Sequence, residues 1–305
     1  MRYKLLKACL SAVARLPLAV LYGLADLICP ILHHIVRYRL RTVRANLRNA
    51  FPDKTSQQRR RIERAFYHHL CNTVAETVKQ IHMSPQETMR RMTFSGLENI
   101  TTLFEQGHPY VFVMLGHFGN WEWISSLQYW LPDVHCSQIY HRLTDKDFDR
   151  IFLEVREKYG GECVEMKGTL RHLLSMRRRH EKIVVGFIAD QQPRWSAVHY
   201  FLPFLHQETA VFTGAETLAR KLNAAAVYGH VTCPRRGYYH CHMEPLPILP
   251  AEEGCFPFTD AYMARLEEDI IAAPHLWLWT HKRWTRTRER WLQRRKETEN
   301  SPATT

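Results

Sequence analysis

The residues best suited to chemistry are His117 and Glu122, five positions apart in the run GHFGNWE. A carboxylate that fixes the tautomer of a histidine leaves the other ring nitrogen able to take a proton from an alcohol. An alcohol activated in this way can attack a thioester. In a continuous helix, five steps of about 100° would put the two side chains on different faces, but Gly116 and Gly119 permit a tight turn that brings them together. Taken alone, such a pair more often has a capping or core role.

The elements around this motif indicate how it is positioned. An apolar run at 110–115 predicts a strand directly before it, and Asn120 is suited to cap a helix that follows it. Further short runs rich in β-branched or aromatic residues predict strands at 134–140, 183–189 and 224–231. Helical patterns lie between them at 147–159, 168–180 and 211–222. This alternation predicts an α/β domain with a central mixed sheet flanked by helices.

Several blocks of the sequence together resemble one known family. HFGNWE resembles the His-x-x-x-x-(Asp/Glu) signature of glycerolipid-type acyltransferases, in the form typical of the bacterial lipid A biosynthesis (late, secondary) acyltransferases, the lauroyl- and myristoyl-transferase family. The other blocks, in family order, are NLRNAFPD (46–53), FSGLENI (94–100), DQQP (190–193), YFLPFLHQETAVFTGAETLAR (200–220) and PHLWLWTHKRW (274–284). Ordered blocks along most of the chain are more specific than any one motif.

The resemblance implies a glycerolipid acyltransferase-like fold and an enzyme on the cytoplasmic face of the inner membrane of a Gram-negative bacterium. Such enzymes take a fatty acyl chain from acyl carrier protein or acyl-coenzyme A and esterify a hydroxyl of a lipid A precursor. In that mechanism His117 is the general base, Glu122 orients it, and neither a metal nor another cofactor is needed. Fold does not fix the substrate, so the alternative acceptor is another hydroxylated lipid or glycolipid, such as an ornithine lipid, a mannoside or a pigment. The alternative from another class of protein is a non-catalytic, membrane-associated binding protein.

Four further residues are expected to contact substrate. Asp190 and Gln191 follow a predicted strand, where α/β proteins collect functional groups, although Asp and Gln there also commonly build a turn. Asn120 lies within the motif. Where the family shows Tyr-Arg-Pro, this chain has Tyr140-His141-Arg142, and Arg142 is the expected substitute for the family's arginine.

A basic cluster is the expected docking site for an acidic acyl carrier protein. It consists of Arg171, Arg177, Arg178 and Arg179. The alternative is the solvated end of a helix, where cations also suit the helix dipole.

The two ends of the chain carry its positive charge. The formal net charge is +12, with about +11 in residues 1–64 and about +5 in 282–305, counted from the sequence. Basic ends suit an anionic lipid surface, and no nucleic-acid-binding motif accompanies them, so nucleic acid is not an expected partner. The eight cysteines are scattered without a CxxC pair, as expected for free thiols. The tryptophans at 277, 279 and 284 are compatible with an interfacial belt or with core packing.

The chain therefore divides into three expected parts. Residues 1–36 form an N-terminal membrane anchor, because the apolar stretch 16–36 is long enough to span a bilayer core of about 30 Å. Asp26 in its middle and basic residues on both flanks make a shallow surface anchor an equal alternative. Residues 37–296 form the acyltransferase domain, and 297–305 a disordered tail.

Overall fold

A seven-stranded mixed sheet lies at the centre of the computed structural model, which describes residues 1–180, 182–248, 252 and 254–299. The strand order is β1-β9-β8-β2-β5-β3-β4, and β6 and β7 form a separate hairpin. The strands are β1 (Met92–Ser95), β2 (Tyr110–Leu115), β3 (His135–Tyr140), β4 (Glu162–Glu165), β5 (Ile183–Ile188), β6 (Phe201–Phe204), β7 (Gln207–Ala210), β8 (Ala225–Arg235) and β9 (Tyr238–Leu246). From β8 to β4 neighbouring strands are parallel, whereas β9 is antiparallel to β8 and β1 is parallel to β9. The predicted mixed central sheet is confirmed.

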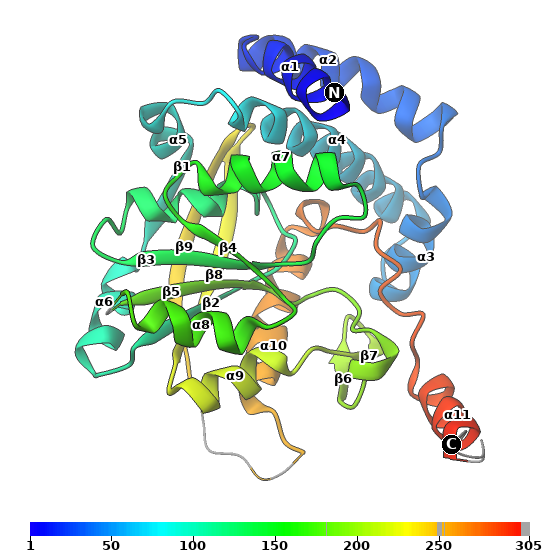
Figure 1. Cartoon of the computed structure of the whole chain (residues 1–305). Coiled ribbons are helices and arrows are strands. Elements are labelled where there is room, and N and C mark those ends of the chain that lie inside the picture. The colour runs from blue at the N-terminus through cyan, green and yellow to red at the C-terminus, as the bar shows by residue number, and fades with distance from the viewer. Residues whose placement is uncertain (181, 249–251, 253, 300–305) are drawn as a thin grey trace.

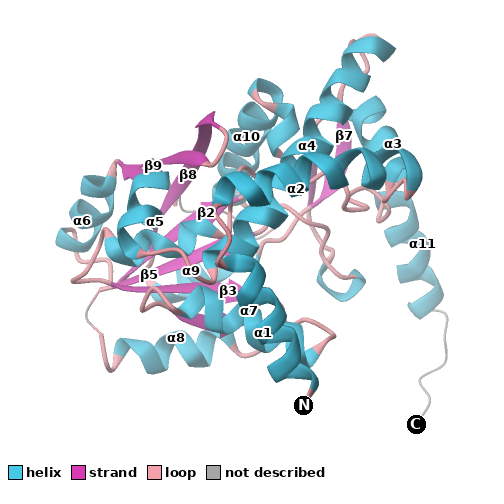
Figure 2. Ribbon diagram, turned by 90° about the horizontal axis from the view of Figure 1, so that it is seen from above, coloured by secondary structure: helices cyan, strands magenta, loops and turns pink. Residues whose placement is uncertain are grey.

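Helices surround the sheet, and the N-terminal ones gather at one end of it (Figure 1). The helices are α1 (Arg2–Ala14), α2 (Leu18–Pro30), η1 (Ile31–Ile35), α3 (Leu40–Ala50), α4 (Ser56–Gln80), α5 (Pro85–Arg91), α6 (Leu97–Glu105), η2 (Trp123–Tyr129), α7 (Lys146–Glu157), α8 (Thr169–Arg177), η3 (Trp195–Ala197), α9 (Gly214–Leu222), α10 (Pro257–Ala272), η4 (Pro274–Leu276) and α11 (Arg288–Glu299). Both views place α11 at the periphery (Figures 1 and 2). The predicted tail begins within α11, and residues 300–305 lie outside the described part of the chain.

Strand β2 carries the motif and lies inside the sheet between β8 and β5. All its residues are buried, which explains why its sequence is continuously apolar and does not alternate. It runs parallel to β5, with Leu115 paired to Ile188. The chain therefore leaves β2 and β5 at the same edge of the sheet, and this adjacency brings His117 next to Asp190.

The N-terminal helices pack on the rest of the protein. By length and composition, the segment Leu18–Ile35 is long and apolar enough to cross a membrane, with a mean hydropathy of 1.6. One face of α2, with Leu18, Leu21 and Ala25, is buried and lies against α4. The exposed apolar residues of this segment are Val20, Leu24, Leu27, Ile28, Ile31 and Ile35.

Candidate active site

The loop after β2 depends on two glycines. A Cβ on Gly116 would lie 2.6 Å from Leu266 Cδ1. Gly119 has a φ of +60°, and a Cβ there would lie 2.7 Å from Val231 Cγ1, so both space and backbone conformation favour glycine. The chain bends at His117 and at Gly119, and the side chain of His117 is 21% exposed.

His117 is held by the carboxylate of Asp190. Its Nδ1 lies 2.6 Å from Asp190 Oδ1, and its backbone N–H donates to Asp190 Oδ2 at 3.0 Å. The indole Nε1 of Trp277 donates to the same Oδ2 at 2.7 Å. Asp190 is 1% exposed, so these donors replace the water that a buried carboxylate would otherwise need. The structure thus brings Asp190, one of the expected site residues, into contact with His117.

The charge of Asp190 fixes the tautomer of His117. Burial alone would raise the pKa of Asp190, but the adjacent imidazole and the hydrogen bonds from His117 and Trp277 lower that pKa to about 2. An ionised carboxylate can only accept a hydrogen bond, so Nδ1 of His117 carries the proton. Nε2 is left with its lone pair, and the amide of Gln191 lies 3.3 Å from it. Nε2 is thus the nitrogen able to take a proton from a substrate hydroxyl.

Glu122 binds an arginine, and in the described structure its carboxylate forms no hydrogen bond with His117. Arg156 donates from Nε to Glu122 Oε2 at 2.8 Å and from Nη2 to Oε1 at 2.7 Å. Trp121 lies between the two motif residues: its Nε1 donates to Glu122 at 3.2 Å, and its ring is 5.3 Å from that of His117. The expected pairing of His117 with Glu122 is therefore replaced by pairing with Asp190. Asn120 is fully buried directly after Gly119, whereas Glu122 lines the cleft together with Arg156.

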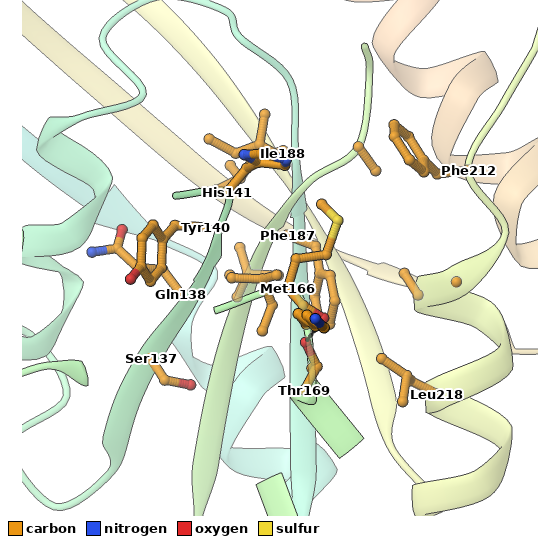
Figure 3. A pocket seen from close by; sticks show the side chains of 18 of the residues that line it. Ser137, Gln138, Tyr140, His141, Met166, Thr169, Phe187, Ile188, Phe212 and Leu218 are labelled. Atoms are coloured by element: carbon orange, nitrogen blue, oxygen red, sulfur yellow. Dashed lines mark hydrogen bonds between the residues drawn. The ribbon is translucent and has the colours of Figure 1, made fainter. Parts of the chain in front are cut away.

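His117, Glu122 and Gln191 line one large cleft with a volume of about 1890 Å³. Its walls come from residues of β2, β3 and β5 and from α8 and α9. Figure 3 shows Tyr140 and Gln138 on the β3 side and Phe212 and Leu218 on the α9 side, with Met166 and Phe187 between them. Clefts for small ligands measure roughly 300–1,000 Å³, so this cleft has room for a long apolar chain as well as a polar group.

Two of the residues expected to bind substrate lie elsewhere. Asn120 is 0% exposed, so a substrate cannot reach it. Its Oδ1 instead accepts a hydrogen bond from Trp123 N at 3.1 Å, although the N-cap position of η2 is Glu122 and not Asn120 as predicted. Arg142 points to Glu165, at 3.2 Å. The cleft is lined at that point by the neighbouring His141, which lies 2.6 Å from the guanidinium of Arg194. Asn120 is therefore a structural residue of the loop, and His141 takes the cleft position expected for Arg142.

The basic cluster on and after α8 divides between two surfaces. Arg171 and Arg178 line the cleft. Arg177 donates instead to the carbonyl of His180 at 3.1 Å, and Arg179 lies 3.4 Å from Glu162. Residues 171 and 178 are seven apart, or nearly two helical turns, which places them on one face of the helix. That face borders the site.

Two residues of the site were not predicted as such. Trp277 was weighed between a membrane belt and core packing, and at 3% exposure it is a core residue that also binds Asp190. The sequence does not single out Arg156, because an arginine within a helix rich in charged residues looks like any other solvent-exposed arginine. It is recognised only by its contact with Glu122.

Comparison with known protein families identifies one that covers nearly all of this architecture. The sequence matches the family of bacterial lipid A biosynthesis acyltransferases over residues 2–286, which includes the N-terminal helices, the sheet and the segment carrying Trp277. No individual curated protein matches the chain. The protein is an acyltransferase and belongs to the bacterial lipid A biosynthesis acyltransferase family.

Proposed function

We propose that this protein transfers a fatty acyl chain from an acyl thioester to a hydroxyl of a lipid A precursor, with His117 as the general base. One observation carries the proposal: the imidazole of His117 is bound through Nδ1 to a buried carboxylate while the ring borders a large cleft. That arrangement supplies a proton acceptor beside a space suited to a lipid. The family membership supports the reaction class.

The reaction follows from this arrangement. Nε2 of His117 takes the proton of the acceptor hydroxyl as its oxygen bonds to the thioester carbonyl carbon. The carbon–sulfur bond then breaks, and the imidazolium returns its proton to the departing thiolate. Asp190 stabilises the imidazolium through the 2.6 Å contact while that charge exists. The transferred acyl group ends as an ester of the acceptor.

We assign Glu122 a positioning role in this mechanism. Its bidentate pair with Arg156 joins the start of η2 to α7 across the cleft wall. Bidentate arginine–carboxylate pairs fix geometry as well as charge. Loss of the Glu122 carboxylate would leave the guanidinium of Arg156 unpaired beside the site, which links Glu122 to activity without direct contact with His117.

The donor is best accommodated at the basic side of the cleft. Arg171 and Arg178 line it together with Lys167 and Arg194. An acyl carrier protein presents acidic side chains, and coenzyme A presents phosphates, so either donor would meet complementary charge there. The acyl chain would then extend along the apolar walls formed by Phe187, Phe212 and their neighbours.

The protein is proposed to reach its lipid acceptor by resting on the membrane surface. The exposed apolar face of α2 and η1 is backed by a face that packs on α4. Asp26 on α2 is bound by Arg236 through two hydrogen bonds of 2.7 and 2.8 Å. A helix that is packed and ion-paired along one side suits shallow insertion better than a free transmembrane span.

An acceptor panel tests the proposed function. Purified protein would be incubated with acyl carrier protein or coenzyme A carrying a radiolabelled acyl chain. The acceptor would be a lipid A precursor, an ornithine lipid or a mannoside. We expect the label to move onto the lipid A precursor in preference to the others. Transfer to another acceptor alone would overturn the acceptor assignment, and no transfer with any pair would overturn the enzymatic proposal.

A further inference from the structure

Successive residues on one face of α4 contact successive residues of the loop 116–122, which carries His117 and is called the catalytic loop below. His69, Glu76 and Gln80 are spaced by seven and four positions, so they share a helix face. His69 Nε2 lies 3.2 Å from the carbonyl of Gly119, and Gln80 donates to the carbonyl of Glu122 at 3.4 Å. Between them, Glu76 binds the side chain of Asn120. The order along the helix matches the order along the loop.

Glu76 is a buried carboxylate that joins three elements. It is 0% exposed and accepts hydrogen bonds from Tyr22 on α2 (2.6 Å), Asn120 of the loop (2.7 Å) and Tyr239 on β9 (2.9 Å). Burial raises the pKa of Glu76, whereas the hydrogen bonds from these three side chains act against that rise and favour the ionised form. The mechanism described above does not use this carboxylate, yet it holds the loop that carries His117.

The bond to Asn120 has a defined consequence for the loop. Because Nδ2 of Asn120 donates to Glu76, its Oδ1 faces the opposite way and accepts the backbone N–H of Trp123. That second bond holds Trp123, the first residue of η2, immediately after Glu122. Glu76 thereby fixes the chain between the two charged residues of the motif.

The link continues into the N-terminal segment. The hydroxyl of Tyr22 lies against the β8–β9 turn, where a Cβ on Gly237 would come within 2.1 Å of it. Arg236 of the same turn binds Asp26 and lies over the Tyr22 ring, 4.2 Å from its centre. Tyr22 is therefore held in place on α2, and it contacts Glu76 from a fixed position.

We propose that Glu76 is a positioning residue for the catalytic loop, and that the hydrogen bond from Tyr22 to Glu76 makes the N-terminal helix α2 part of the same positioning network. The inference rests on the proposed role of His117. It differs from an anchoring role for residues 1–36, because it predicts that contacts of α2 alter the chemical step even when no membrane is present.

The first test compares two buried carboxylates on the same helix. Glu76→Gln keeps the shape of the side chain and removes its charge. Glu63→Gln is the matched control, because Glu63 is 4% exposed and binds Arg44 and His33 away from the loop. With detergent-dispersed acceptor, we expect Glu76→Gln to lower kcat about tenfold to 10²-fold, the scale expected for displacement of a catalytic group by about 1 Å. The donor KM should change by less than about twofold, and Glu63→Gln should lower thermal stability without this loss of kcat.

A second test uses rescue. In the paired exchange Glu76→Gln with Asn120→Asp, the amide on α4 donates to a carboxylate on the loop, and that carboxylate can still accept the backbone N–H of Trp123. We expect the double variant to be more active than the product of the two single losses predicts. Tyr22→Phe should also lower kcat in detergent, with the KM for donor little changed.

The outcomes separate this inference from the proposed function. Full turnover by a folded His117→Ala protein would overturn both. With His117→Ala inactive, the inference alone is overturned if Glu76→Gln keeps the kcat of Glu63→Gln, if the paired exchange shows losses that simply multiply, or if Tyr22→Phe retains full kcat in detergent.

Discussion

The substitution Asp190→Asn tests which carboxylate orients His117. Oδ2 of Asp190 accepts two N–H groups, from the His117 backbone and from Trp277. An asparagine at this position would therefore turn its oxygen toward those two donors and its NH₂ toward Nδ1 of His117. Nδ1 would have to become the acceptor, so the ring proton would move to Nε2, the nitrogen that faces the substrate.

This reversal of the tautomer sets the size of the effect. With Nε2 protonated, the lone pair needed for proton abstraction is absent, and the contribution of a general base, about 10²–10⁴ in rate, is lost. The known effect of the equivalent change in serine proteases, about 10⁴ in kcat, is of the same origin. Since the amide retains the hydrogen bonds to the two N–H groups, the protein should remain folded.

Single-turnover transfer of radiolabelled acyl chains would measure the loss, with melting temperatures recorded in parallel. Glu122→Gln is the informative comparison, because Glu122 contacts Arg156 and should act through it. We expect Asp190→Asn to approach the rate of His117→Ala and Glu122→Gln to retain more activity. Near-parental activity of Asp190→Asn, with Glu122→Gln reduced to the level of His117→Ala, would refute the assignment.

The remaining predictions concern the donor and stability. Reversing Arg171 and Arg178 to Glu should raise the donor KM and leave the acceptor KM nearly unchanged, whereas reversing Arg179, which binds Glu162, should alter neither KM. Steady-state kinetics with both substrates varied would measure the two constants. Equal donor KM values in the two variants would contradict docking at this face. Burial lowers the pKa of His69 to about 4, against about 6.5 in an unfolded chain, so the unfolded state binds more protons and stability is lost as pH falls from about 6.5 toward 4. Between pH 7 and 5 this amounts to about 2 kcal/mol, and urea unfolding should show His69→Gln to be less sensitive to that pH change; an unchanged sensitivity would contradict the assignment of a neutral, buried imidazole.

The sheet was predictable where its strands are buried on both faces. Strands β2 and β5 and the first part of β8 appear in the sequence as largely apolar runs, and they begin close to their predicted positions. Strand β3 also forms where it was predicted, although its sequence HCSQIY is mixed and only partly buried. Strand β9 did not stand out, because its sequence YYHCHMEPL alternates polar and apolar residues and its burial alternates accordingly. Such alternation marks a strand near the edge of a sheet, where one face meets other elements or solvent.

The site was predictable only in part, because its main contact spans 73 positions. His117 and the turn followed from local sequence, in which Gly116 and Gly119 surround a candidate base. The partner of His117 depended on β5 lying beside β2, and strand order is not encoded in local spacing. Asp190 was therefore expected near the site without its contact to His117, while the nearer carboxylate, Glu122, was assigned that contact.

The central claim is that His117 activates a hydroxyl of a lipid A precursor, which the family resemblance predicts to lie on a 3-hydroxyacyl chain. It is tested most directly by mass spectrometry of products from two matched acceptors, one carrying 3-hydroxyacyl chains and one carrying the corresponding chains without the hydroxyl. We expect the parental enzyme to add one acyl group to the hydroxylated acceptor and none to the other, and His117→Ala to add none to either. An acylated product from the acceptor without the chain hydroxyl, or parental rates from a folded His117→Ala protein, would contradict the account.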